Sequence, residues 1–271
     1  MAIIKNSIDA ITENKFKDFF LVAFSETVRT VSNTRNGEFK LYRIPQKELE
    51  NFNPNVLNEF EKNVSYNIAK MKEYFLERKK CAVNLLDEDT RKIKSIPRNS
   101  VDLLISSPPY GDSRTTVAYG QFSRLALQWL GYDSERVKSI DKTSIGGIPT
   151  KELKNGLHSP SLKKTLPNIS SIDPKRAKDV LSFYEDFWQC VKEIDKIMAS
   201  GSRLCFVVGN RTVKKIQIPT DRIIVELFES LGNYSNESNF ERNIPNKRMP
   251  KANSPSNVPG EIVSTMNKEH I

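Results

Sequence analysis

A rigid polar turn follows a short apolar stretch near the middle of the chain. The sequence SPPY, residues 107–110, comes directly after Val101–Ser106, whose aliphatic residues are typical of a buried strand. Pro108 and Pro109 fix two φ angles and remove two N–H donors, so the turn is stiff. The hydroxyl of Ser107 and the carbonyl of Pro108 could accept hydrogen bonds from an exocyclic amino group, and Tyr110 offers a face on which an extruded base can stack. The turn therefore predicts a site that orients an amino group.

The elements expected around this turn follow the pattern of an α/β protein. Helical periodicity of apolar residues predicts three helices downstream of the turn, at 119–130, 173–201 and 219–231. The second of these begins with Asp173 as its cap and Pro174 at its first position. Three short apolar runs are candidate strands, at 83–86, Val101–Ser106 and 203–208. This alternation predicts a mainly parallel sheet, in which ligands bind beyond the carboxyl ends of the strands.

Residues 1–80 are expected to form an N-terminal helical segment. An apolar cluster within 15–31 is one candidate helix. Over 54–80, Pro54 suits the first turn and Asn53 is a plausible cap. We interpret this longer helix as a packing element without chemistry, because its apolar residues recur every three or four positions: Leu57, Phe60, Val64, Ile68, Met71 and Phe75.

The stretch SSPPYGDSRTTVAYGQFS, residues 106–123, resembles the catalytic motif of the amino-methylating DNA methyltransferases. The serine form, SPPY, is similar to the branch that methylates the N4 amino group of cytosine, whereas the N6-adenine branch more often carries Asp or Asn in place of Ser107. The segments CFVVGNR and NIPNKRMP resemble late strands and the closing part of such enzymes. The resemblance covers residues 81–271, and it implies a Rossmann-like sheet and S-adenosylmethionine as cofactor.

The resemblance also implies roles for individual residues. Ser107, Pro108, Pro109 and Tyr110 match the catalytic motif, and Ser107 lies beside the cofactor as well. Asp89 matches the acidic residue expected near the adenine of the cofactor. The predicted contacts to DNA are Gly111, Asp112, Ser113, Arg114, Lys163 and Lys164.

One part of the family pattern is missing from the sequence. The family binds its cofactor with a glycine-rich loop, because glycine lets the backbone approach the ligand closely. No glycine lies between Gly37 and Gly111, and the VVGN at 207–210 has only one. The cofactor half of the sheet is therefore expected to be incomplete. Either a second polypeptide supplies the loop, or the chain is a truncated and inactive fragment.

A basic stretch interrupts the α/β pattern. Residues 135–178 hold ten Lys and Arg against four Asp and Glu, a net charge of +6, together with four prolines and the pair Gly146-Gly147. The resemblance suggests a target-recognition insert here, in which basic side chains contact phosphates and a few others read base edges. A solvated basic loop is the alternative. The net charge of +9 for the 271 residues also favours a polyanionic partner, though weakly.

Several function classes are excluded or disfavoured by composition. The three cysteines, Cys81, Cys190 and Cys205, are widely spaced and are expected to be buried free thiols. With two histidines in the chain, a zinc site built on Cys or His pairs is not expected, and we predict no metal. No run of about 18 apolar residues and no signal peptide is found, which predicts a cytoplasmic protein that does not contact a membrane.

These observations predict a site-specific enzyme that transfers methyl from S-adenosylmethionine to N4 of cytosine in duplex DNA, in a restriction–modification system. Two other classes stay open. A DNA-binding fragment of a split or decayed enzyme would bind duplex DNA with a strong dependence on salt and without turnover. An N6-adenine, RNA or protein methyltransferase would be distinguished by its preferred substrate.

Overall fold

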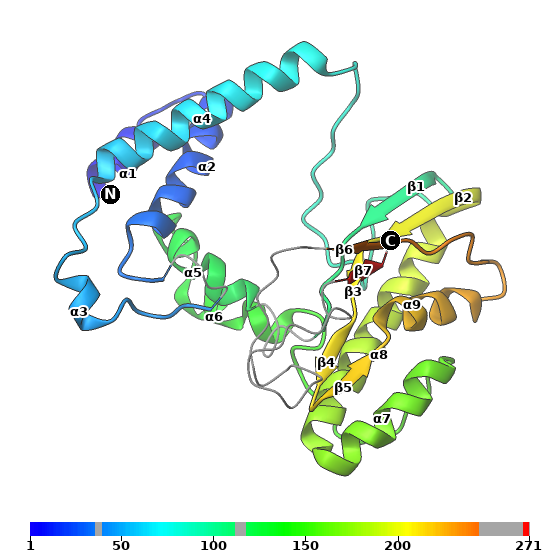
Figure 1. The fold of residues 1–271 in the computed structure, drawn as a ribbon. Helices are drawn as coiled ribbons and strands as arrows, with labels where there is room; N and C mark the ends of the chain where they lie inside the picture. Colours follow the sequence, from blue (N-terminus) through cyan, green and yellow to red (C-terminus); the bar gives the residue numbers. More distant parts are fainter. Residues whose placement is uncertain (36–39, 112–117, 244–267, 271) are drawn as a thin grey trace. The chain divides into compact units, whose positions relative to one another are not determined.

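The computed structural model of the chain describes residues 1–35, 40–111, 118–243 and 268–270, and contains helices and three small sheets (Figure 1). The described residues form two compact units. Unit 1 comprises Met1–Asn84 and Ala118–Asp141, and unit 2 comprises Leu85–Val117 and Lys142–Ile271. The predicted boundary near residue 80 is close to the break at residue 84, but residues 118–141 group with the N-terminal helices.

Unit 1 is helical. Buried Ile4, Ile8, Phe24 and Val28 form its centre, and Phe60 packs against them. This agrees with the helical N-terminal segment expected from the sequence. The helices are α1 (Ala2–Asp9), α2 (Asn14–Val31), α3 (Gln46–Leu49), α4 (Val56–Glu77), α5 (Tyr119–Trp129) and α6 (Ser134–Thr143), the last two residues of which belong to unit 2.

Helix α4 differs from its prediction in two ways. Its cap is Asn55, whose side chain accepts a hydrogen bond from the Asn58 N–H at 3.1 Å, so the prediction of Asn53 is wrong. Because Pro54 lies before this cap, it does not occupy the first turn of the helix. Four of the six residues of the apolar stripe are also exposed, among them Met71 at 41% and Phe75 at 53%.

Unit 2 has a core built around one long helix. The core contains α8 (Pro174–Ile197) and buried residues of α7 (Pro160–Ile172) and α9 (Thr220–Glu229). Asp173 caps α8 and Pro174 occupies the first position, as predicted, and the Asp173 carboxylate accepts from the Lys175 and Arg176 N–H groups at 3.1 Å. The helix ends at Ile197 rather than near Gly201, because the chain passes directly into a strand.

Two parallel strands carry the segments that the sequence singled out. Strand β1 (Val101–Ser106) pairs in parallel with β2 (Met198–Phe206), and Leu104 lies opposite Leu204. The strand over 101–106 forms as predicted, but it is not buried, because Leu103 and Ile105 are exposed while Leu104 between them packs against the core of unit 2. The predicted strand at 203–208 is divided, because β2 ends at Phe206 and β3 (Val208–Gly209) belongs to another sheet.

The other sheets are antiparallel. In one, β3 pairs with β7 (Lys268–His270), which also pairs with β6 (Glu241–Asn243). In the other, β4 (Arg211–Val213) and β5 (Ile216–Ile218) form a hairpin. The structure is therefore mixed α and β with a small parallel sheet, whereas the Rossmann-like sheet remains an expectation.

Two local expectations are wrong. Residues 83–86 form no strand, and their side chains are exposed, because a short apolar run becomes a strand only where another strand pairs with it. Cys81 is exposed and Cys205 half-buried, so of the three free thiols only Cys190 is buried. Burial raises the pKa of the Cys190 thiol to about 12, which keeps it protonated and unreactive.

Within the described residues, no helix is both long and apolar enough to cross a membrane.

Candidate functional site

The SPPY turn begins where β1 ends, at the carboxyl edge of the parallel pair (Figure 1). Ser106 lies opposite Phe206, and the Val207 N–H donates to the Ser106 carbonyl at 2.9 Å. Because parallel strands end at the same edge, the turn and residues 207–211 leave the sheet side by side. Two motifs about a hundred residues apart in sequence therefore meet at one place.

Ser107 and Pro108 present hydrogen-bond acceptors at this edge. Ser107 is exposed, and its hydroxyl makes no hydrogen bond with any residue that the structure describes. Pro108 is half-buried, which is consistent with a turn held against the sheet. The two prolines fix the direction of the turn, so these acceptors need little reorganisation to meet an amino group.

Tyr110 is half-buried and packs against the core of unit 2. Its ring lies against Gly209, where an added Cβ would be 3.1 Å from Cε2. The next residue, Gly111, is buried, and the side chain of Arg211 crosses it so closely that a Cβ would be 2.1 Å from Nη1. Gly209 and Arg211 were not predicted from the sequence. They lie in the segment VVGNR, whose resemblance to a late strand of the family was the one indication of them.

The remaining predicted DNA contacts fall into two groups. Asp112, Ser113 and Arg114 lie outside the described residues. Lys163 and Lys164 are exposed on α7, while the buried face of that helix, including Leu162, faces the core. The stretch 135–178 is thus not a simple solvated loop, because it contributes α7 and part of the core of unit 2.

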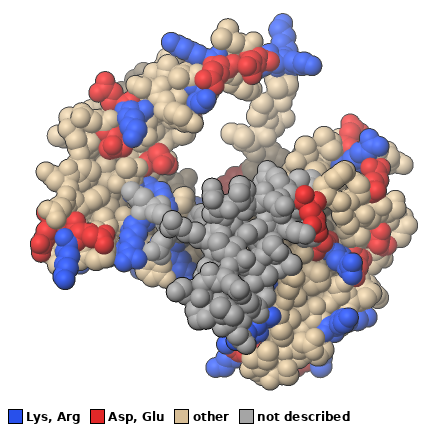
Figure 2. All heavy atoms as spheres, viewed as in Figure 1, with Lys and Arg blue, Asp and Glu red and all other residues tan. Residues whose placement is uncertain are grey.

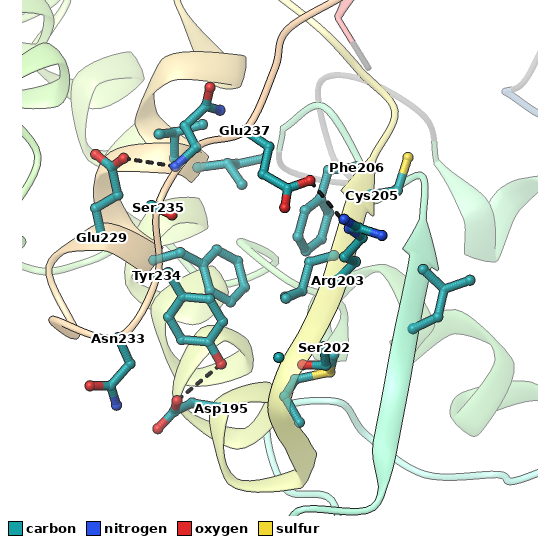
Figure 3. A pocket seen from close by; sticks show the side chains of 18 of the residues that line it. Asp195, Ser202, Arg203, Cys205, Phe206, Glu229, Asn233, Tyr234, Ser235 and Glu237 are labelled. Carbon is teal, nitrogen blue, oxygen red and sulfur yellow. Dashed lines mark hydrogen bonds and ion pairs between the residues drawn. The ribbon is translucent and has the colours of Figure 1, made fainter.

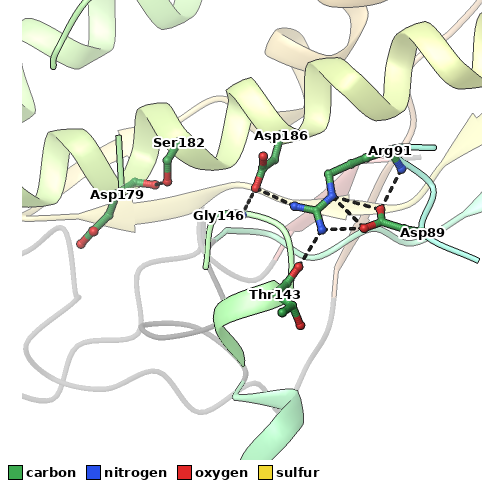
Figure 4. Close-up of polar contacts among 7 residues, drawn as sticks. All are labelled: Asp89, Arg91, Thr143, Gly146, Asp179, Ser182 and Asp186. Atoms are coloured by element: carbon green, nitrogen blue, oxygen red, sulfur yellow. Dashed lines mark hydrogen bonds and ion pairs between the residues drawn. The ribbon is translucent and has the colours of Figure 1, made fainter. Parts of the chain in front are cut away.

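Asp89 is held by an arginine (Figure 4). Both oxygens of its carboxylate accept from the guanidinium of Arg91, with Nη2–Oδ2 at 2.6 Å and Nε–Oδ1 at 3.0 Å. The same guanidinium donates to Asp186 of α8 at 3.2 Å and to the Thr143 carbonyl at 2.6 Å. Asp186 in turn accepts from the Gly146 N–H at 2.8 Å. Arg91 therefore ties three separate segments together.

Electrostatics keeps this cluster charged. The hydrogen bond from Arg91 holds the pKa of the Asp89 carboxyl below its usual range, against a smaller opposing effect of burial. The pKa of Arg91 is raised, chiefly by the same hydrogen bond. Asp89 is thus an ionised acceptor whose direction is fixed, and sequence analysis missed the two residues, Arg91 and Asp186, that fix it. The Asp-x-Arg spacing at 89–91 is a local signal that could have identified Arg91.

A separate hollow of about 1010 Å³ lies along β2, and Leu103 of β1 also lines it (Figure 3). It is bounded by β2, α9 and residues 233–240, and two polar contacts cross or border it. Tyr234 donates to Asp195 at 3.0 Å, and Arg203 pairs with Glu237 at 3.3 Å. None of residues 107–110 lines this hollow, so it is not the site predicted from the sequence.

Charges of both signs are interspersed on the face drawn in Figure 2, so the described residues visible there form no continuous basic field. Among the residues that the structure describes, no group of three or more His, Cys, Asp or Glu is placed to hold a metal ion.

The chain is similar to one known methyltransferase. The chain is 43% identical over 286 aligned positions to the Type II methyltransferase M.MvaI of Kocuria varians. The alignment includes the whole of this chain and 63% of that protein, so the chain spans less than two thirds of the relative that it matches. No protein-family model matches the chain, and no solved structure is significantly similar to it.

Proposed function

We propose that the chain is the DNA-facing part of a type II DNA methyltransferase that modifies the N4 amino group of cytosine in duplex DNA, within a restriction–modification system. The observation that carries this proposal is the position of the SPPY turn. Ser107 and Pro108 lie at the carboxyl edge of a parallel pair, where ligands bind in open sheets. The identity to M.MvaI over the full chain supports the same class.

The residues of the turn would hold the target amino group. That group is a poor nucleophile, because its lone pair is delocalised into the ring. The Ser107 hydroxyl and the Pro108 carbonyl accept its two N–H bonds and direct the nitrogen toward the methyl donor, while Tyr110 stacks on the extruded base. When bound, S-adenosylmethionine would supply the methyl group to this nitrogen, and the proton that the nitrogen then loses would pass to solvent.

S-Adenosylmethionine would supply the methyl group, but the chain fits only part of this cofactor. Asp89 is an ionised and oriented acceptor suited to a ribose or adenine donor. The glycine-rich loop for the methionine part is missing from the sequence. We therefore propose that a further polypeptide segment supplies it.

The exposed face of β1 favours the proposal that a further segment packs on this chain. Leu103 is 56% exposed and Ile105 is 70% exposed, although Leu104 between them packs in the core. Parallel strands are normally covered on both faces. The alignment leaves more than a third of M.MvaI unmatched, so a related protein contains additional sequence that could cover these residues. We propose that the segment with the glycine loop packs on Leu103 and Ile105.

The test is transfer of labelled methyl from S-adenosylmethionine to unmethylated plasmid DNA. The chain is assayed alone and together with the part of M.MvaI that the alignment leaves out, and that part is also assayed by itself. Activity only in the mixture is expected. Mass spectrometry of the hydrolysed DNA should then find N4-methylcytosine, whereas N6-methyladenine would correct the proposed base.

Two variants test the turn in the active mixture. Ser107→Ala and Tyr110→Ala should each lower methyl transfer about 10- to 100-fold, as expected for removing one positioned hydrogen bond or one stacking contact. Ser200→Ala and Tyr66→Ala remove the same groups from exposed positions and should leave activity unchanged. Normal activity of either turn variant would contradict the role assigned to that residue.

The missing glycine loop specifically favours one other function, a DNA-binding fragment without catalysis. Such a fragment would retain salt-dependent binding to duplex DNA and show no methyl transfer in any mixture. Preferred methylation of RNA or protein in a competition assay would instead show that the substrate class is wrong.

A further inference from the structure

Gly209 lies against the aromatic ring of the SPPY turn. A Cβ built at Gly209 would lie 3.1 Å from Cε2, 3.2 Å from Cδ2 and 3.6 Å from Cζ of Tyr110. These distances are shorter than ordinary van der Waals contact for the first two atoms. Any side chain at this position would therefore push the ring, whereas glycine leaves room for it.

The three distances also show whether Gly209 lies beside the edge of the Tyr110 ring or over one of its faces. A point in the plane of the ring and close to the Cδ2–Cε2 bond would be much farther from Cζ than from the other two atoms. Here the distance increases by only a few tenths of an ångström. Gly209 therefore lies over one face of the Tyr110 ring.

The backbone of Gly209 is fixed by its neighbours, so the ring rather than the strand would move. Gly209 lies opposite Glu269 in the pairing of β3 with β7, and the adjacent Val208 is buried. Two residues earlier, Val207 is bonded to the end of β1. The φ angle of Gly209 is not in the left-handed region, so alanine is compatible with the backbone, and the three atoms nearest to its Cβ would all belong to the Tyr110 ring.

We infer that Gly209 is a positioning residue, which sets the height and tilt of the Tyr110 ring for stacking on the extruded base. The role in stacking rests on the proposed function. The contact between Gly209 and Tyr110 does not depend on that function. Alanine at 209 should displace the ring by a few tenths of an ångström. Because a displaced ring would hold the extruded base less well, we expect a three- to ten-fold rise in KM for DNA, with a smaller change in kcat.

The first experiment detects the contact without any substrate. The full chain is labelled with 3-fluorotyrosine at its eight tyrosines, and the fluorine resonance of Tyr110 is assigned by its loss in Tyr110→Phe. Gly209→Ala should shift this resonance and leave most of the other seven in place. The matched control is Gly156→Ala, because an added Cβ at Gly156 has no atom within 4 Å. An unmoved Tyr110 resonance in Gly209→Ala would overturn the inference.

The second experiment is kinetic and uses the active mixture described above. Gly209→Ala should raise KM for DNA, and Ser200→Ala, at an exposed position outside residues 135–178, should not. In the Tyr110→Ala background the effect of Gly209→Ala should vanish, because the two residues act through one contact. Full additivity would show that Gly209 acts by another route and would also overturn the inference.

The two experiments separate the failure of this inference from that of the proposed function. If the unmodified mixture transfers no methyl group, the proposed function fails, and the spectroscopic result alone decides whether Gly209 positions Tyr110. If the resonance shifts and KM does not change, the ring is positioned by Gly209 but stacking is not its role.

Discussion

Helices α4 and α8 have similar sequence patterns and opposite environments. They contain 22 and 24 residues, and each carries an apolar residue at every third or fourth position. Twelve residues of α8 are buried, whereas none of α4 is. In its own unit, α8 is packed by α7 and α9, while α4 packs chiefly on α2. Apolar periodicity thus identifies a helix and the face that can be buried, but the number of packing elements decides how much of that face is covered.

The largest expected difference comes from removing a leucine side chain from each helix. Leu181 of α8 is 0% exposed, and Leu76 of α4 is 88% exposed. Leu181→Ala should destabilise unit 2 by about 2–5 kcal/mol, since it leaves a cavity, and Leu76→Ala should change the stability of unit 1 by less than about 0.5 kcal/mol. Hydrogen exchange resolved by peptide measures each unit separately, because two units need not unfold together. Equal effects would show that the second half of α4 is covered as well as α8.

A smaller difference is expected from the two caps. The carboxylate of Asp173 accepts two backbone N–H bonds at α8 and pairs with Lys214 at 3.1 Å, whereas the amide of Asn55 accepts one N–H at α4. Asp173→Ala should therefore increase exchange in the first turn of α8 more than Asn55→Ala does in α4. The comparison is made on the first-turn amides of each helix. A larger effect at α4 would contradict the ranking.

The smallest expected effect is a dependence on pH at one helix only. Hydrogen bonding, first from the Arg176 N–H and then from Lys214, lowers the pKa of Asp173 below its ordinary value of 3.8. A lowered pKa means that the cap stabilises the folded state above pH 3.8 and that this contribution is lost as the pH falls through the folded value. Amide hydrogen exchange in the first turn of α8, corrected for intrinsic rates, should therefore increase as the pH falls below 3.8. Asp173→Asn keeps an acceptor without a titrating group and should remove the pH dependence, as at α4, where Asn55 does not titrate.

Local signals in the sequence predicted where helices and strands form more reliably than they predicted what those elements pack or pair with. The Asp173-Pro174 start of α8 and the strand over Val101–Ser106 are confirmed, because a cap and an apolar run act within a few residues. Residues 83–86 have the composition of a strand but no strand beside them. Pairing depends on distant residues, so composition could not decide it.

The candidate site shows the same division. The polar turn was recognisable because the proline pair and its position after a strand are local features. The contact between Tyr110 and Gly209 joins residues 99 positions apart, and no spacing in the sequence indicates it. Asp89 was singled out, but Asp186, the other carboxylate that accepts from Arg91, is on a helix almost a hundred residues downstream. The roles of Ser107, Tyr110 and Asp89 in methyl transfer remain proposals.

The parallel pairing of β1 with β2 also has a consequence during synthesis. Ser106 finds its partner, Phe206, only after one hundred further residues have been translated. At about 5–20 residues per second, β1 stays unpaired for about 5–20 s after it leaves the ribosome. During that interval Leu103, Leu104 and Ile105 are available to pair with strands of other chains, so this strand is a site where aggregation can begin.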